Sequence, residues 1–191
     1  MGIFWNPHQD CFLYRITVQP TEDKVTKRSI LSQVASLYDP LGLLGPVIIK
    51  AKILLQALWK LQLTWDEAVP EEIYIAWKAF QNQKSELNNI SFPRQVCIAQ
   101  YKNLQLHGFA DASETAYGAC LYIRSSNDQE TRVILVCSKT RVAPLKRLTV
   151  SRLELSAALL LTQLCEFVLN AFFKTTFDKI ILWSDSTIAP Q

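Results

Sequence analysis

The feature that most constrains the fold is a change in the apolar pattern near residue 100. Beyond it, apolar residues come in short runs separated by polar clusters, a pattern typical of strands in a sheet. The runs are 104–111, 116–124, 132–139 and 179–183, and the apolar segment 151–174 between the last two predicts a long helix. The polar link 125–128 predicts that the second and third strands form an antiparallel hairpin.

The first hundred residues follow helical spacing instead. Thr26 is a candidate N-cap for a helix that ends at Asp39-Pro40, a second helix is expected over 46–63, and a third begins at Pro70. An alternating segment, 12–18, predicts one strand before them. The expected fold class is therefore α/β, or α+β overall: a mainly helical segment over 1–100, then a mixed sheet with a long helix over 101–191.

Composition excludes several classes of protein. With 49% hydrophobic and 19% charged residues the chain can fill a core, which argues against disorder, and its net charge of +3 selects no partner. The five cysteines include no Cys-x-x-Cys pair and the two histidines lie far apart, so a zinc site is not expected and the thiols fit a reducing compartment. Without a signal peptide or an evident membrane span, the chain is expected to be intracellular, cytoplasmic or nuclear.

Three acids stand where an apolar element presents a carboxylate. Asp111 and Asp185 end predicted strands, and Glu154 lies in the first turn of the predicted long helix. Converging carboxylates suit a hard divalent cation such as Mg²⁺, which can activate water for phosphodiester hydrolysis. Each acid also has a plainer interpretation: Ser151 and Glu154 fit a capping box, and the two aspartates fit turns or helix caps. Spacing alone leaves both open.

A basic run and an aromatic set also have two interpretations each. The stretch between Glu130 and Glu154 contains no acid, and it could follow nucleic-acid phosphates or form a solvated loop. Its cations include Lys139, Arg141, Lys146, Arg147 and Arg152. The aromatic residues Trp59, Trp65, Trp77 and Phe80 could stack bases, but their helical spacing favours core packing.

Several long motifs resemble BEL/Pao retrotransposon polyproteins, in the same order and over nearly the whole chain. The run KRSILSQVASLYDPLGLLGPV at 27–47 resembles the region that follows the reverse transcriptase palm. The later motifs resemble the ribonuclease H-like part: HGFADASETAYG at 107–118, KTRVAPLK at 139–146, RLEL at 152–155 and WSDSTI at 183–188.

The resemblance implies a connection-like segment, 1–100, followed by a ribonuclease H-like domain, 101–191. Asp111, Glu154 and Asp185 match the first three acids of a site that binds Mg²⁺ or Mn²⁺ and cuts the RNA strand of an RNA–DNA hybrid. The two-ion site is expected only in the complete domain. The five cations named above are expected to hold the nucleic-acid backbone rather than read sequence.

The chain also departs from the family pattern. The pattern continues to a fourth acid beyond residue 191 and carries its polymerase aspartates upstream, so the resemblance implies a C-terminally truncated fragment, inactive alone, whose partners include the rest of the polyprotein. Ser151 replaces a common proline and is expected to strengthen the helix cap. A non-catalytic nucleic-acid-binding or domesticated interaction module is the alternative. Aspartic peptidase activity, suggested by the name Pao retrotransposon peptidase family, is not expected because no Asp-Thr/Ser-Gly triplet occurs.

Overall fold

The computed structural model describes residues 2–16 and 24–186 and divides the chain into two compact units. Unit 1 comprises 1–40 and 46–94, and unit 2 comprises 41–45 and 95–191. Each unit has a hydrophobic core of its own. The fold class is α/β, as predicted, and the family-based boundary at residue 100 stays a prediction.

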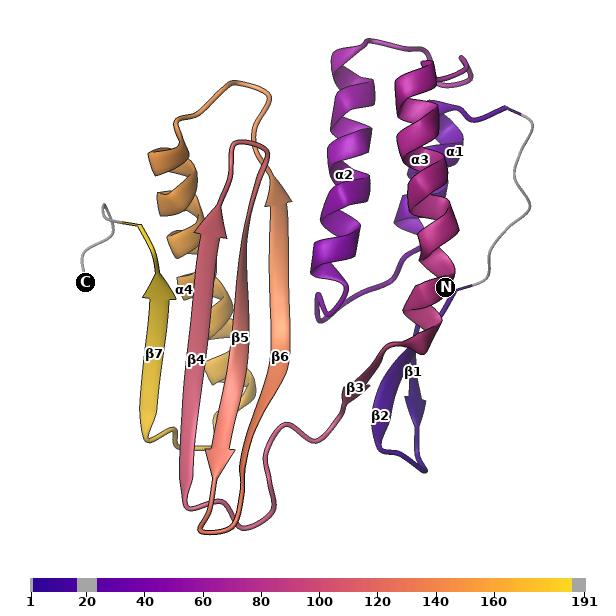
Figure 1. The fold of residues 1–191 in the computed structure, drawn as a ribbon. Coiled ribbons are helices and arrows are strands. Elements are labelled where there is room, and N and C mark those ends of the chain that lie inside the picture. The colour runs from indigo at the N-terminus through magenta and orange to yellow at the C-terminus, as the bar shows by residue number, and fades with distance from the viewer. Residues whose placement is uncertain (1, 17–23, 187–191) are drawn as a thin grey trace. The chain divides into compact units, whose positions relative to one another are not determined.

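Unit 1 combines a small antiparallel sheet with three α-helices and one 3₁₀ helix (Figure 1). Its strands, in sheet order, are β1 (Gly2–Asn6), β2 (Cys11–Arg15) and β3 (Ser91–Pro93). Its helices are α1 (Lys27–Ala35), α2 (Gly45–Lys60), α3 (Glu71–Gln83) and the 3₁₀ helix η1 (Lys84–Asn89). The core of this unit is built from Val25, Ile30, Val34, Ala51, Leu55, Leu58 and Trp77.

The three predicted helices are confirmed, although α1 ends at Ala35, before the predicted end at Asp39-Pro40. The residues at the N-termini of α1 and α3 show where these two helices begin. Thr26 accepts a hydrogen bond from the Ser29 backbone N–H, while the Ser29 hydroxyl accepts one from the Thr26 backbone, which completes a capping box for α1. Pro70 is the N-cap of α3. The predicted strand is confirmed over β2, whereas Val18 lies outside the described residues.

The aromatic set is only partly core. Trp77 is buried and stacks on Phe80, as predicted, but Trp59 and Trp65 are 48% and 41% exposed. These two indoles hold the ammonium of Lys27, whose Nζ lies 3.5 Å from the centre of the Trp59 ring and 5.1 Å from that of Trp65. Helical spacing could not predict the exposure of Trp59 and Trp65, because the attraction of a cation to their ring faces competes with burial of the rings.

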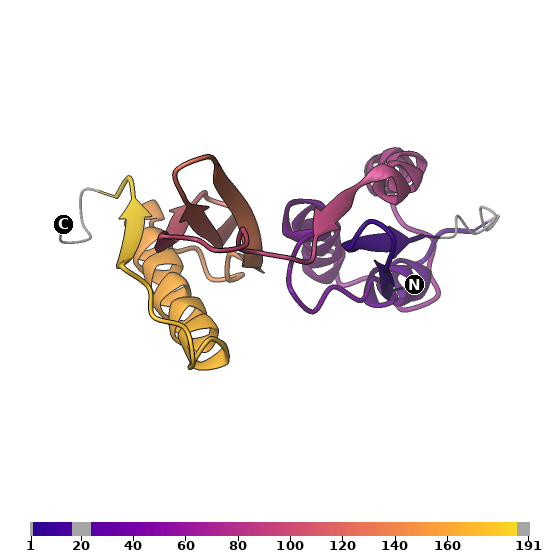
Figure 2. The same cartoon turned by 90° about the horizontal axis from the view of Figure 1, so that it is seen from below.

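Unit 2 is a four-stranded sheet with a long helix on one face (Figures 1 and 2). Its elements are β4 (Asn103–Ala112), β5 (Ala116–Ser126), β6 (Thr131–Val142), α4 (Val150–Ala171) and β7 (Lys179–Ser184). The sheet order is β6-β5-β4-β7; β5 is antiparallel to both neighbours and β7 is parallel to β4. The predicted order of these elements along the chain and the predicted hairpin of β5 and β6 are confirmed.

Helix α4 packs on the inward side chains of β4 and β5. Leu106 and Leu121 are fully buried from the sheet side, and Leu161 and Val168 are nearly so from the helix. At Gly108 a Cβ would come within 2.8 Å of side chains from α4, β5 and β7, so the absent side chain lets these elements approach closely. The even-numbered residues of β4 therefore face the helix, and the odd-numbered ones face the other side.

The segment 41–45 belongs to unit 2 because it is bonded to β6. The Ser138 backbone N–H donates to the Leu41 carbonyl at 2.9 Å, and the Ser138 hydroxyl donates to the Gly42 carbonyl. Gly42 has a φ of +70°, and a Cβ there would lie 1.9 Å from the Ser138 carbonyl oxygen. Only glycine fits this approach.

One helix in the described part of the chain, α4, is long and apolar enough to cross a membrane when judged by length and composition. The core helix of a soluble protein passes the same test. Since the buried face of α4 packs on the sheet, this observation is weak support for a membrane span.

Candidate functional site

Two of the three singled-out acids lie at one edge of the sheet in unit 2. Strands β4 and β7 are parallel, and their last pair is Ala110 with Ser184. Asp111 and Asp185 each follow directly, and both are exposed. Because β4 and β7 run parallel in this register, both carboxylates lie at the same end of the sheet, where these two strands end.

Glu154 reaches this edge from the start of α4. Its Oε2 accepts a hydrogen bond of 2.8 Å from the hydroxyl of Ser186, the residue after Asp185. This bond ties the beginning of the helix to the end of β7. We call Asp111, Glu154 and Asp185 the acid edge.

The capping-box interpretation of Glu154 is wrong. The N-cap of α4 is Thr149, whose hydroxyl accepts from the Arg152 backbone N–H, so Ser151 lies inside the helix and does not cap it. The sequence alone could not distinguish Thr149 from Ser151 as the N-cap, because both residues carry a hydroxyl just before the apolar run. Glu154 thus has no capping role.

The turn after β4 is held by Ser113 rather than by Asp111. The Ser113 hydroxyl accepts from the backbone N–H groups of Thr115 and Ala116, at 3.4 and 3.2 Å. Among the described residues, Asp111 accepts a hydrogen bond from the neighbouring Ala112 N–H alone, at 2.6 Å, through Oδ1. A second oxygen of this exposed carboxylate remains for a ligand.

The donor chemistry of the acid edge suits a hard divalent cation, because three carboxylates supply oxygen ligands. In the described residues, however, no group of three or more His, Cys, Asp or Glu side chains is gathered closely enough to hold a metal ion. The residue types and strand positions fit a metal; the side-chain positions do not form a finished ligand set.

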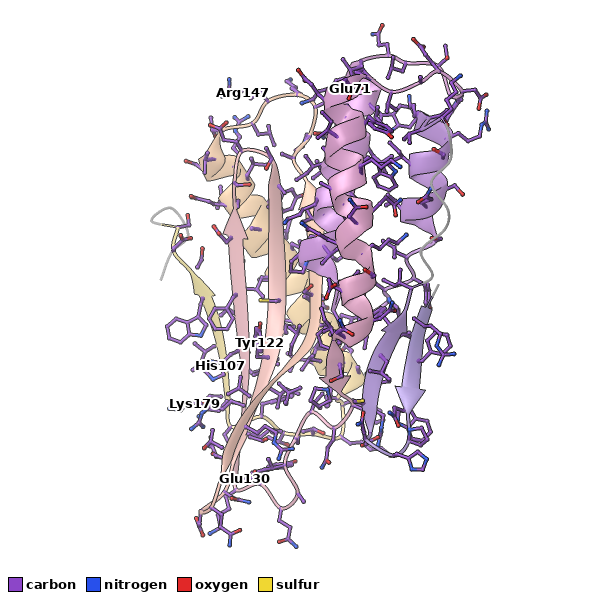
Figure 3. All side chains as sticks on the ribbon, turned by 45° about the vertical axis from the view of Figure 1, so that its right-hand side comes forward. Glu71, His107, Tyr122, Glu130, Arg147 and Lys179 are labelled. Carbon is purple, nitrogen blue, oxygen red and sulfur yellow. The ribbon has the colours of Figure 1, made fainter. Side chains whose placement is uncertain are left out.

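The predicted cations belong to elements at the same end of the sheet. Arg147, in the loop from β6 to α4, lies 3.7 Å from Glu114 in the turn after β4, and Figure 3 shows it at the end of the sheet opposite Glu130. Both partners of this pair are more than 70% exposed, so it contributes little to stability. The other exposed cations are Lys139 and Arg141 at the end of β6, Lys146 in the loop, and Arg152 on α4.

Sequence reasoning missed an aromatic group on the sheet face opposite α4. The rings of His107 and Phe109 on β4 lie beside the Trp183 ring on β7. Trp183 Nε1–H donates to His107 Nδ1 at 3.3 Å, and His107 Nε2 lies 3.0 Å from Gln105 Oε1. Because Gln105 Oε1 can only accept, we assign the proton to Nε2. The alternation of strand residues was the signal that could have revealed this face.

Burial, and then the nearby Arg124 guanidinium, lower the pKa of His107 below its usual value. Both causes disfavour a second ring proton, which agrees with an Nδ1 atom that accepts from Trp183.

Comparison with known proteins gives a family and two similar structures. A family model described as a Pao retrotransposon-like RNaseH-like domain matches residues 26–186. A structure of the foamy viral protease-reverse transcriptase dRH with double-stranded DNA is 15% identical, with a TM-score of 0.39 over 88% of this chain and 27% of that one. Another, of the foamy viral protease-reverse transcriptase with double-stranded DNA, is 13% identical, with a TM-score of 0.36 over 85% and 42%. The chain thus spans less than half of either protein, and no curated sequence matches it.

Proposed function

Because the chain belongs to the Pao retrotransposon-like RNaseH-like domain family, we propose that it supplies the acid edge of a metal-dependent nuclease that cuts the RNA strand of RNA–DNA hybrids. The family match confirms the resemblance stated from the sequence motifs. One observation carries the proposal: parallel pairing brings Asp111 and Asp185 to one edge, where Ser186 anchors Glu154.

In this proposal Asp111, Glu154 and Asp185 hold Mg²⁺ or Mn²⁺. A bound ion would act as a Lewis acid that activates water and stabilises the leaving oxygen. The Ser186 hydroxyl orients the Glu154 carboxylate. The five exposed cations around the edge neutralise backbone phosphates and position the hybrid without reading its sequence.

The isolated chain binds the hybrid but does not cleave it efficiently. This follows from the acid edge, whose described carboxylates are not gathered into a metal-binding group. We assign completion of the site to the rest of the polyprotein, together with the bound substrate. The five free cysteines support an intracellular setting, cytoplasmic or nuclear, for this work.

Paramagnetic Mn²⁺ tests the metal assignment directly. With a non-cleavable hybrid present, Mn²⁺ should broaden the backbone NMR signals of Asp111, Glu154 and Ser186. Asp111→Asn should weaken this effect roughly tenfold or more, since a lost outer-shell partner alone costs that much. The control Asp128→Asn removes an exposed acid at the other end of the sheet, where it pairs with Lys102, and should change nothing. Equal broadening in both variants would contradict the assignment.

Cleavage and binding assays separate the remaining alternatives. We expect a labelled hybrid to bind and its RNA strand to stay largely intact with Mg²⁺ or Mn²⁺. Efficient cleavage that is abolished by Asp111→Asn would contradict the proposed inactivity of the isolated chain but would support the acid edge as the catalytic site. Cleavage by the Asp111→Asn variant at the wild-type rate would contradict the assignment of the acid edge as the catalytic site. Binding without any Mn²⁺ effect would favour the non-catalytic binding module instead.

A further inference from the structure

A short segment of unit 2 is bonded along the edge of its sheet. Residues 41–45 belong to this unit although they lie more than 50 positions before its other residues, and we call them the strap. Strand β6 is at the sheet edge, and β5 is its one strand neighbour in the described part of the chain. An edge strand leaves a row of backbone N–H and C=O groups without a strand partner. On this side of β6, Ser138 donates two hydrogen bonds to the strap, one to the Leu41 carbonyl and one to the Gly42 carbonyl.

The strap fits β6 too closely to be a passing loop. Gly42 has a φ of +70°, and a Cβ there would lie 1.9 Å from the Ser138 carbonyl oxygen. A Cβ at Gly45 would lie 2.6 Å from the Ser138 hydroxyl oxygen, which would have to move. Leu43 and Leu44, between the two glycines, are 6% and 2% exposed. Release of the strap would therefore cost two hydrogen bonds and expose two apolar side chains.

The residue that the strap holds stands next to two of the predicted phosphate-binding cations. Lys139 follows Ser138 directly, Arg141 lies two residues further on, and both are exposed. Residues two apart on a strand share a face, so these cations lie on the face of Cys137, which is buried in the core beneath α4. Neither cation takes part in an ion pair among the described residues, so both charges are available to a ligand.

A bulge explains why this end of β6 needs a support of its own. Cys137 is opposite Leu121, whereas Leu135 is opposite Tyr122, so Val136 is an extra residue on β6. A bulge interrupts the ladder and bends the strand. The end of β6 beyond Val136 can therefore change its direction independently of the rest of the strand, unless a second partner fixes its free side. The strap is that partner.

We propose that the strap is a positioning element for nucleic acid: by holding Ser138 it fixes the end of β6 and places Lys139 and Arg141 against backbone phosphates. The inference rests on the proposed binding of an RNA–DNA hybrid and adds the segment that sets the direction of two of its cations. Leu41 to Gly45 themselves touch no substrate and act through β6.

Binding of a labelled RNA–DNA hybrid, measured by fluorescence anisotropy in EDTA, tests this coupling on the full chain. Gly42→Ala should weaken binding roughly fivefold, but by about twofold or less when Lys139→Gln and Arg141→Gln are also present. The control background, Lys102→Gln with Arg132→Gln, removes the same charge at the other end of the sheet and should keep the full effect of Gly42→Ala. Equal effects in the two backgrounds would mean that the strap only stabilises the fold, and would overturn the proposal.

Hydrogen exchange measures whether the strap has been released. In the Gly42→Ala variant the amide of Ser138 should exchange about tenfold faster, because its acceptor is lost, while that of the fully buried Leu121 should keep its rate. The control Gly2→Ala adds a Cβ that meets nothing within 4 Å and should change neither exchange nor binding. Faster exchange at Ser138 without weaker hybrid binding would overturn the proposal.

A milder variant guards against a Gly42→Ala chain that fails to fold. Ser138→Ala removes the hydroxyl that donates to Gly42 and leaves the backbone bond to Leu41, so it should weaken hybrid binding roughly threefold. This effect should also disappear when Lys139 and Arg141 are replaced by glutamine, and its persistence there would overturn the proposal. Failure of the unaltered chain to bind the hybrid would overturn the proposed function together with this inference, whereas binding with uncoupled effects would overturn this inference alone.

Discussion

His107 shows how one residue couples a hydrogen-bond chain to pH. It accepts from Trp183 through Nδ1 and, through Nε2, donates to Gln105, whose side-chain N–H in turn donates to Asn103. A proton on Nδ1 would replace an acceptor with a second donor facing the indole N–H. The folded protein therefore disfavours the charged ring, in agreement with a pKa lowered by burial and by Arg124.

This lowered pKa predicts a loss of stability in mild acid. Between the folded pKa of His107 and about 6.5, the unfolded chain binds a proton that the folded chain does not. The free energy of unfolding should thus fall as pH drops from 7.5 to 5.5. His107→Gln should reduce this fall, measured from urea midpoints at both pH values. The control His8→Gln changes an exposed residue of unit 1 and should keep the wild-type fall; an equal fall in both variants would contradict the prediction.

At the scale of elements, the local apolar pattern predicted the long helices and strands. It did not predict a short strand whose pairing partner is distant in the sequence. The apolar run of α4 and the alternation of β4 were visible because each buries many residues of its own. Strand β3 has only three residues and pairs with β2 about 80 positions away, supported by the Arg94 to Asp10 ion pair. No local period reports such pairing, so β3 was missed. Strand β1, which pairs with its neighbour β2, was not predicted either.

The start of α4 gives a test of this limit. Thr149→Ala removes the side chain that caps the helix and should lower the free energy of unfolding by about 1 kcal/mol. Ser151→Ala should change it by less than about 0.5 kcal/mol, because the Ser151 hydroxyl does not cap the helix. Chemical denaturation of both variants measures the difference. A larger loss from Ser151→Ala would restore the capping box that the sequence suggested.

At the scale of the whole molecule, a net charge of +3 conceals an uneven distribution. The order of the strands and the helix along the chain could be predicted from the sequence, but the parallel pairing of β7 with β4, which places Asp111 and Asp185 at one end of the sheet, could not. The sequence could not show that the β6–α4 loop reaches the turn after β4, because Arg147 and Glu114 meet only through the folded sheet. Nor could it reveal Ser186 as the partner of Glu154, since that bond joins residues 32 positions apart.

If the cations beside the acid edge hold the hybrid, the salt dependence of binding should be local as well. Each lost phosphate contact lowers the slope of log K against log salt by about 0.9 on a duplex. Lys146→Gln with Arg147→Gln should therefore flatten the slope by up to about 1.8, as measured by anisotropy with a labelled hybrid. Lys102→Gln with Arg132→Gln removes the same charge beside Asp128 and Glu130, at the other end of the sheet, and should preserve the slope. Equal flattening in both pairs would mean that the overall charge of the protein, rather than the loop beside the acid edge, attracts the nucleic acid.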